Sequence, residues 1–258
     1  MFETLELTVD ARGVATVSLN RPEKRNAISG QMIAELAQMA ENLATNQSVR
    51  VVILQGAGGH FCAGGDLGWM KAQIAADSPT RAREARKLAD MLSVWNALPK
   101  PVIARIEGSA FGGGVGLACV CDIAVATSGA KFGLTETKLG LIPATIGPYV
   151  VARMGEGMAR RVFMSSRVFG AQEACRLGII GIVSDDLDAA VEVEIAAYLE
   201  CAPGAIAEAK ALALTLGGAP GSDEIDYSIN ALVKRWESDE SNEGIAAFFD
   251  KRKAAWSQ

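Results

Sequence analysis

The stretch "AFGGGVGLACVCD", residues Ala110 to Asp122, places four glycines within five positions, and an apolar run follows at once. Glycine costs about 1 kcal/mol relative to alanine inside a helix, so this density of glycine needs a reason. The preceding segment reads as a strand and the following one as a helix, whose first N–H groups are free and whose dipole favours negative charge. The stretch therefore predicts a turn that binds either a phosphate group or a smaller oxyanion through its backbone.

Nucleotide-binding motifs match this stretch poorly. The pattern GxGxxG is met only weakly within residues 112–117, and no acidic ribose ligand follows a strand about 20 residues on. A phosphate-binding P-loop ends in Gly-Lys-Ser/Thr, whereas this chain reads Gly-Val-Gly-Leu at that place. The small oxyanion remains as the better interpretation.

A second glycine turn follows the same logic. In "VVILQGAGGHFCAGGDLGWM", residues 51–70, a continuous apolar strand leads to Gly64 and Gly65, and Asp66 then begins a helix. Either motif alone is explained by a tight turn without any ligand. Together, two turns that each follow a parallel-type strand can direct one N–H each at a single oxygen, which is an oxyanion hole.

Composition limits the class of protein. The chain has 258 residues, 50% of them hydrophobic and 21% charged, and its net charge of −5 argues against a general nucleic-acid partner. No signal-peptide pattern and no apolar run of about 18–20 residues is found, so we expect a cytoplasmic protein without a membrane segment. A single histidine and five cysteines without ligand spacing argue against a metal site and favour free thiols.

The order of predicted elements indicates an α/β fold. Strands, helices and glycine turns fill residues 1–190, and residues 191–258 read as successive helices. The first two strands are joined by a turn at residues 11–13, and the next helix begins after Ser29, a possible cap. The segment "GPYVVARMGEGMARRVFMS", residues 147–165, reads as helical. We therefore place the only domain boundary near residue 190.

The two turns and their surroundings resemble the crotonase, or enoyl-CoA hydratase/isomerase, superfamily. The similar segments occur in family order along nearly the whole chain, which makes the combination specific although no single segment is. They are "SLNRPEKRNAIS" (18–29), "HFCAGGDL" (60–67), "KPVIARIEGSAFGGGVGLACVCDIAVA" (100–126), "AKFGLTETKLGLIP" (130–143) and "AAFFDKRKAAW" (246–256).

This resemblance implies a fold and a ligand. The fold is a spiral of strand–strand–helix repeats with a C-terminal helical region that forms a homotrimer or a dimer of trimers. The substrate is an acyl-CoA thioester, and coenzyme A enters as part of it, so no separate cofactor is expected. The two backbone donors to the thioester oxygen fall on Gly65 and Gly113, which explains why bare backbone is needed there.

The resemblance also implies where coenzyme A binds. An isolated basic cluster such as "RPEKR" is more often a solvated turn, but in this family similar segments hold the nucleotide. Lys251 resembles a lysine that reaches a neighbouring subunit's nucleotide phosphate. The expected CoA-binding residues are Lys24, Arg25, Ala27, Ala63, Gly64, Asp66, Leu67 and Lys251.

The acid/base residues depart from the family pattern. Standard hydratases use two glutamates, and the second of them is present as Glu136. The first aligns with Gly116, and no carboxylate lies between Glu107 and Asp122. We expect Glu136 to transfer the proton, and Gly116 to make room for a branched or carboxylated acyl group.

Two activities fit a single glutamate. The segment "IPATIGPYV", residues 142–150, is similar to bacterial methylglutaconyl-CoA hydratases of leucine breakdown, which favours hydration of 3-methylglutaconyl-CoA or a related branched enoyl-CoA. The alternative is a Δ3,Δ2-enoyl-CoA isomerase, in which one glutamate moves a proton between two carbons. A non-catalytic binding member is disfavoured by the negative net charge. His60 is interpreted as a loop-surface or structural histidine, and nothing near Cys62 in the sequence would lower the pKa of its thiol, so neither is placed in the site.

Overall fold

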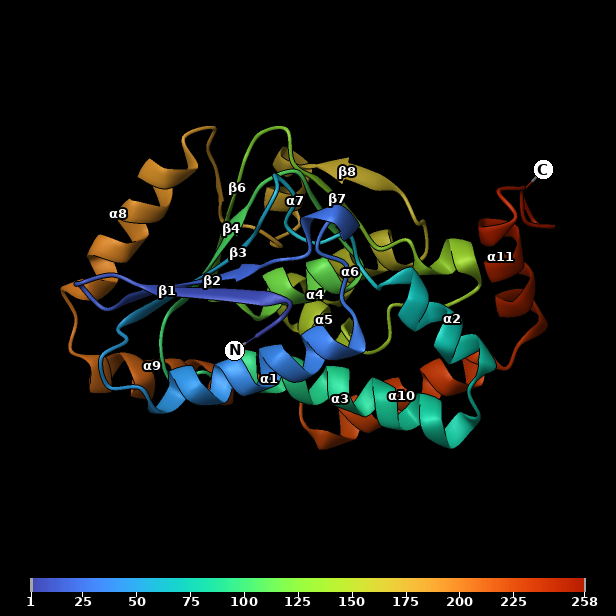
Figure 1. The fold of residues 1–258 in the computed structure, drawn as a ribbon, viewed down its shortest axis with the longest axis horizontal. Helices are drawn as coiled ribbons and strands as arrows, with labels where there is room; N and C mark the ends of the chain where they lie inside the picture. Colours follow the sequence, from blue (N-terminus) through green and yellow to red (C-terminus); the bar gives the residue numbers. More distant parts are fainter. Residues whose placement is uncertain (1, 258) are drawn as a thin grey trace.

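The computed structural model describes residues 2–257 and shows a mixed α/β fold built on two sheets (Figure 1). In the larger sheet the strand order is β1-β2-β3-β4-β6-β9. Its first pair is antiparallel and every later pair is parallel. Its strands are β1 (Leu5–Val9), β2 (Val14–Leu19), β3 (Val51–Gly56), β4 (Val102–Ile106), β6 (Ile123–Ala126) and β9 (Ile182–Val183).

A second, smaller sheet has the strand order β5-β7-β8. The pair β5–β7 is parallel and β7–β8 is antiparallel. Its strands are β5 (Ser109–Phe111), β7 (Lys131–Gly133) and β8 (Val168–Gly170). Strands β5, β8 and β9 are not found by the sequence analysis, because segments of two or three residues are too short to show an alternating pattern.

Helices surround the sheets and make up the end of the described chain. Two short 3-10 helices, η1 (Pro22–Lys24) and η2 (Glu136–Leu139), lie in loops. The α-helices are α1 (Gly30–Thr45), α2 (Leu67–Ala75), α3 (Ser78–Asn96), α4 (Gly113–Val120), α5 (Gly147–Met154), α6 (Glu156–Phe163), α7 (Ala171–Arg176), α8 (Leu187–Leu199), α9 (Pro203–Leu216), α10 (Ser222–Trp236) and α11 (Asp239–Phe249).

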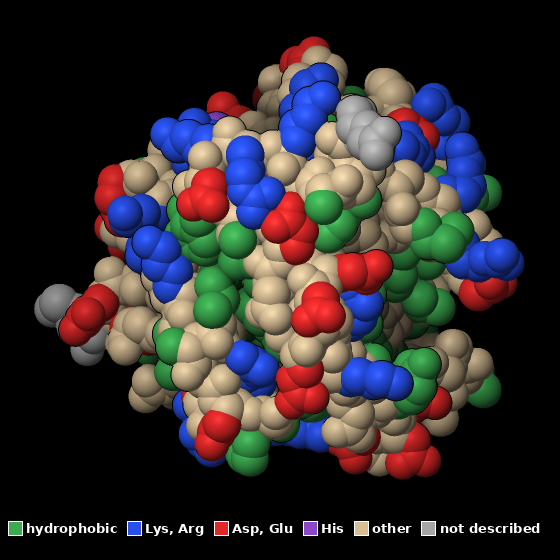
Figure 2. Space-filling view, turned by 90° about the vertical axis from the view of Figure 1, so that its right-hand side faces the viewer, with side chains coloured by type: hydrophobic (Ala, Val, Ile, Leu, Met, Phe, Trp, Pro, Cys, Tyr) green, Lys and Arg blue, Asp and Glu red, His purple; other side chains and the backbone are tan. Residues whose placement is uncertain are grey.

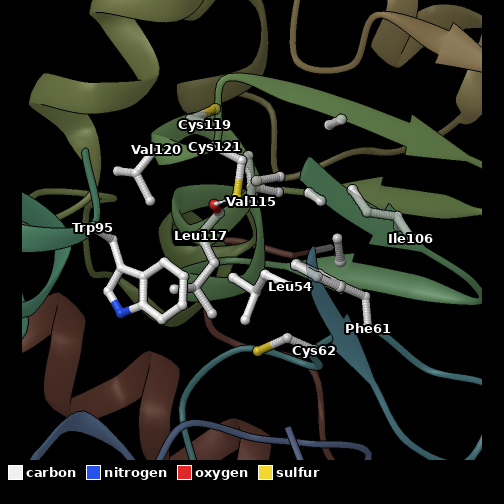
Figure 3. Close-up of a cluster of buried hydrophobic side chains, with 14 of the residues drawn as sticks. Leu54, Phe61, Cys62, Trp95, Ile106, Val115, Leu117, Cys119, Val120 and Cys121 are labelled. Atoms are coloured by element: carbon white, nitrogen blue, oxygen red, sulfur yellow. Dashed lines mark hydrogen bonds between the residues drawn. The ribbon is translucent and has the colours of Figure 1, made fainter. Parts of the chain in front are cut away.

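Strand β3 shows why the predicted apolar run must be a strand covered on both faces. Val52 and Leu54 pack into the large core under α1, α3 and α4, whereas Val51 and Ile53 pack against α8 on the other face. This two-residue alternation follows from strand geometry. Figure 3 shows the large core, where Leu54 lies near Leu117 of α4 and Trp95 of α3.

The predicted helices are largely confirmed. Ser29 caps α1, its side chain accepting a hydrogen bond from the Met32 N–H, as expected. The helical segment 147–165 is interrupted, because Gly155 has φ 77° and separates α5 from α6.

The C-terminal part is helical as predicted, but residue 190 lies inside α8. The buried side chains of α8, Leu187, Val191 and Ile195, pack on the large sheet. The chain therefore passes through this position without a break, and the division into units 1–190 and 191–258 remains a prediction.

None of the described helices is both long and apolar enough to cross a membrane.

Candidate active site

The two glycine turns meet in space. Cys62 and Ala110 form a parallel bridge, in which the Cys62 N–H donates to Ser109 O at 2.9 Å and the Phe111 N–H donates to Cys62 O at 3.0 Å. A Cβ built on Gly112 would lie 3.9 Å from Gly64 Cα. The turns that end β3 and β5 are thus held side by side, as the sequence analysis expected.

The N–H groups of Gly65 and Gly113 face away from the bonds that hold their turns. The neighbours of Gly65 pair with Ile28: the Ile28 N–H donates to Gly64 O at 2.8 Å and the Asp66 N–H to Ile28 O at 2.9 Å. In a parallel bridge of this kind the N–H of the middle residue, here Gly65, points away from the paired residue Ile28. Gly113 is the first residue of α4, where helix N–H groups have no partner within the helix. Within residues 2–257 neither N–H has a hydrogen-bond acceptor.

Gly112 shows why bare backbone is required. Its φ of +47° lies in the left-handed region, which favours glycine, and a Cβ there would lie 2.9 Å from Glu136 Oε1. Gly114 is equally confined, because its Cβ would lie 2.6 Å from Cys62 O. The first allows the carboxyl group to approach the turn, and the second allows α4 to pack against the neighbouring turn.

Glu136 begins η2 and is partly exposed as a residue, but its carboxyl group lies beside Gly112 and its Oε2 atom is buried. Burial raises its pKa from 4.5 to about 7, because the charged form is poorly solvated there. Its Oε2 has no hydrogen-bond partner in the described part of the chain. Near neutral pH this carboxyl group can therefore both give and take a proton.

A cavity of about 960 Å³ connects these groups. Gly65, Gly113 and Glu136 line it, together with Lys251, which follows α11. Helix α11 forms one side of the cavity through Gly244, Ala247 and Phe248. Lys71 Nζ of α2 lies 4.8 Å from the centre of the Phe249 ring of α11. Both helices lie toward the right of Figure 1. Figure 2 shows this side of the molecule, with acidic and basic side chains mixed around apolar recesses.

Four of the eight expected CoA-binding residues line the cavity, namely Ala63, Gly64, Leu67 and Lys251. Lys251 lies at the cavity of its own chain, and its contact with a neighbouring subunit's nucleotide phosphate remains a prediction. Lys24 and Arg25 are exposed at η1, outside the cavity lining.

Ala27 and Asp66 hold the turns rather than lining the cavity. Asp66 caps α2 by accepting from the Gly68 and Trp69 N–H groups at 2.8 and 3.1 Å. It also pairs with Arg21 at 2.9 Å, and Arg21 donates to Ala27 O at 2.7 Å. These bonds join the "RPEKR" segment to the Gly65 turn.

Gly116 is the expectation that the structure contradicts. A Cβ on Gly116 would lie 2.4 Å from Ile146 Cγ2, and Gly116 is not among the cavity-lining residues. The space that the missing glutamate would leave is therefore filled by Ile146, itself 4% exposed and in the cavity wall. Gly116 does not make room for an acyl group. The sequence contained the signal in "IPATIGPYV", but nothing indicated that Ile146 faces Gly116.

Glu136 is the one carboxylate among the described residues that line the cavity. Asp122 is held elsewhere, since it accepts from the Val102 N–H and pairs with Lys210 at 2.8 Å. Glu107 lies near Arg105, outside the cavity. In residues 2–257 no group of three or more potential metal ligands is found.

His60 has a hydrogen-bond partner, and Cys62 is not activated. His60 Nδ1 lies 3.2 Å from Ser109 Oγ, at the bridge between the turns. Cys62 is fully buried, and burial raises the pKa of its thiol to about 12, so it is not a reactive thiolate.

Sequence reasoning missed Asn26. Its side chain is fully buried and donates hydrogen bonds to Ala57 O and His60 O at 2.8 and 2.7 Å, which holds the loop that precedes the Gly64–Gly65 turn.

Comparisons with known proteins show the family of the chain. A model of the enoyl-CoA hydratase/isomerase family matches residues 10–258. Enoyl-CoA hydratase AKT6-1 of Alternaria alternata is 35% identical over 252 residues, which cover 95% of this chain and 82% of that protein. (E)-Benzylidenesuccinyl-CoA hydratase of Thauera aromatica is 30% identical over 250 residues, covering 94% and 95%.

A solved structure gives the same result for the fold. The crystal structure of an enoyl-CoA hydratase from Shewanella pealeana matches with a TM-score of 0.82 and 39% identity, covering 99% of this chain and 97% of that one. The chain belongs to the enoyl-CoA hydratase/isomerase family and is an enzyme of that family. The predicted crotonase-like α/β fold with a helical C-terminal region is confirmed.

Proposed function

We propose that this enzyme adds water across the 2,3 double bond of an enoyl-CoA thioester. The observation that carries the proposal is the buried Glu136 carboxyl group beside two backbone N–H groups, Gly65 and Gly113, that have no acceptor in the described chain. Two such donors stabilise the negative oxygen that forms on the thioester, and one donor is typically worth about 3–4 kcal/mol in the transition state.

Glu136 carries the proton in this proposal. The ionised carboxylate takes a proton from water while the water oxygen bonds to C3 of the acyl group. The electrons of the double bond move onto the thioester oxygen, held by Gly65 and Gly113. The protonated Glu136 then gives the proton to C2, which restores the thioester and completes the addition. A pKa of about 7 supports both steps, because neither form of Glu136 is strongly disfavoured near neutral pH.

For the substrate we propose 3-methylglutaconyl-CoA or a related branched, carboxylated enoyl-CoA. The resemblance of "IPATIGPYV" supports this class. So does the relative named (E)-benzylidenesuccinyl-CoA hydratase, since a succinyl group carries a second carboxyl group. Three lysines also line the cavity, Lys138, Lys251 and Lys253, and they suit the phosphates that any CoA thioester brings; Arg252 lines it too but pairs with Glu243 at 2.7 Å.

Isomerisation of a 3-enoyl-CoA is the second candidate. The single carboxylate in the described cavity favours it, because one glutamate suffices to move a proton between two carbons. Mass spectrometry distinguishes the two activities. We expect the mass of 3-methylglutaconyl-CoA to rise by one water molecule. An unchanged mass with a moved double bond, from a 3-enoyl-CoA substrate, would instead establish the isomerase.

We also propose assembly as a homotrimer or a dimer of trimers. Large apolar side chains are exposed on helices α8 and α9, including Val193, Leu212 and Leu216, with exposures of 68%, 60% and 78%. Burying such side chains between subunits is favourable. Analytical ultracentrifugation measures the assembly directly, and a monomer at micromolar concentration would refute this part.

A further inference from the structure

One polar group at the cavity is not used by the proposed chemistry, the indole N–H of Trp69 on α2. Trp69 lines the cavity, and its Nε1 is buried with no hydrogen-bond partner in residues 2–257. Trp95, in the core, shows the usual arrangement, since its Nε1 donates to Leu36 O at 3.0 Å. A buried donor without a partner bears its full desolvation penalty, so the Trp69 N–H calls for a ligand acceptor.

The indole ring lies between the Gly65 turn and α1. Its Cε3 is 4.0 Å from where a Cβ on Gly65 would lie, and its Cδ1 is 3.7 Å from where a Cβ on Gly30 would lie. Nε1 is bonded to Cδ1, so it is at the α1 side. Ile33 is three residues after Gly30, on the same face of α1, and lines the cavity. The ring thus extends from the proposed oxyanion hole to a second wall of the cavity.

That wall offers no side-chain acceptor. Besides Trp69, the cavity residues contributed by α1, α2 and α3 are all apolar, namely Ile33, Leu67, Met70 and Leu88. An indole nitrogen donates a hydrogen bond and does not accept one. A ligand that satisfies it must therefore bring an oxygen acceptor into otherwise apolar surroundings.

We propose that Trp69 Nε1–H binds an oxygen carried by the acyl chain beyond the reacting carbons, which makes Trp69 a specificity-determining residue. This inference rests on the proposed function, because it takes the occupant to be an enoyl-CoA. The favoured substrates carry a carboxylate or a neutral carbonyl oxygen at that distance. An enoyl-CoA with a plain hydrocarbon chain leaves the N–H unpaired and is used less well.

The variant Trp69→Phe removes the N–H and keeps an aromatic ring. We would measure kcat/KM with 3-methylglutaconyl-CoA, with its neutral methyl ester and with crotonyl-CoA. The expected loss is about tenfold or more for a substrate whose oxygen is bound, and less than about twofold for crotonyl-CoA. If kcat/KM falls only for 3-methylglutaconyl-CoA, the bound oxygen belongs to a carboxylate. If it falls for both 3-methylglutaconyl-CoA and its methyl ester, any carbonyl oxygen is accepted. Trp256→Phe, outside the described cavity lining, is the matched control.

Equal effects of Trp69→Phe on all three substrates would overturn the proposal. Failure of the proposed function is separate, because the unmodified enzyme would then hydrate none of them.

A second measurement reads the ligand contact in the unmodified protein and uses variants only to assign the signal. The chain has four tryptophans, so isotope labelling gives four indole N–H signals in nuclear magnetic resonance. Trp69 is assigned by elimination with single Phe variants of the other three. We expect its signal to move downfield with saturated glutaryl-CoA and much less with butyryl-CoA. The same response to both ligands, or none, would contradict the proposal, whether or not the protein proves to be a hydratase.

Discussion

The cavity has two sides that differ in what builds them. On one side, Gly65 and Gly113 present backbone N–H groups at the ends of short paired segments, next to Glu136. On the other side, the wall consists of side chains from helices and a loop far apart in sequence, such as Ile33, Trp69 and Ile146. A backbone site depends on glycine placement and can be read from the sequence, whereas a side-chain wall depends on packing.

Removing the carboxylate tests the first side most severely. We expect Glu136→Gln to lower kcat by about 10²–10⁴, the usual contribution of an acid/base group, since the amide cannot carry the proton. Steady-state hydration of 3-methylglutaconyl-CoA is the measurement. Glu107→Gln, a carboxylate outside the described cavity lining, is the control and should retain normal turnover. Near-normal turnover of Glu136→Gln would show that another group moves the proton.

The backbone donor is tested by two substitutions at one position. Gly113→Pro removes the N–H, and proline is tolerated at the first position of a helix such as α4, so we expect kcat to fall about 10²–10³-fold. Gly113→Ala keeps the N–H but adds the same Cβ, which would lie 2.7 Å from Ile28 Cδ1. Alanine should therefore lose much less activity than proline. Equal losses, with folding verified by circular dichroism, would assign the effect to crowding instead.

The raised pKa of Glu136 predicts a pH dependence of stability. Because its folded pKa of about 7 exceeds the ordinary 4.5, the unfolded chain releases this proton more readily. The contribution to stability is full below pH 4.5 and is lost as pH rises through about 7. We expect a loss of up to about 3 kcal/mol relative to Glu136→Gln between these limits. Urea unfolding of both proteins across this range measures it, and parallel curves would refute the burial argument.

The other side of the cavity is tested at the contact of Gly116 with Ile146. Gly116→Ala adds a Cβ 2.4 Å from Ile146 Cγ2 and should cost about 1–3 kcal/mol of unfolding free energy through overpacking. Ile146→Ala in the same chain removes Cγ2 and leaves only the Ile146 Cβ contact of 2.9 Å, which relieves the worst of the clash, so the two changes together should cost less than their sum. Denaturant unfolding of the four proteins in this cycle gives the coupling. Additive costs would mean that the two residues do not compete for the same space.

The backbone side of the site was predicted from local sequence order and family resemblance together. Two glycine turns, each after an apolar strand and before a helix, predict backbone donors, and the resemblance assigns those donors to Gly65 and Gly113. Glu136 was found through family resemblance and is placed beside Gly112 by the short sheet of β5, β7 and β8, which has no sequence pattern of its own.

The side-chain wall was not predictable in the same way. The pairing of Gly116 with Ile146 and the buried Trp69 N–H depend on contacts between segments that the sequence does not link. An expectation based on one position, that glycine at 116 leaves space, failed because a core is packed to high density and a neighbour fills such space. The space beside Gly116 can be judged only when the position of the Ile146 side chain is known.

The most direct test of the central claim is a crystal structure of the enzyme with a saturated, unreactive acyl-CoA bound. The account predicts that the thioester oxygen accepts hydrogen bonds from the N–H groups of Gly65 and Gly113 at about 2.7–3.2 Å, with the Glu136 carboxyl group facing C2 and C3 of the acyl chain. A thioester oxygen bound by other groups, or a ligand whose C2 and C3 lie away from Glu136, would contradict it.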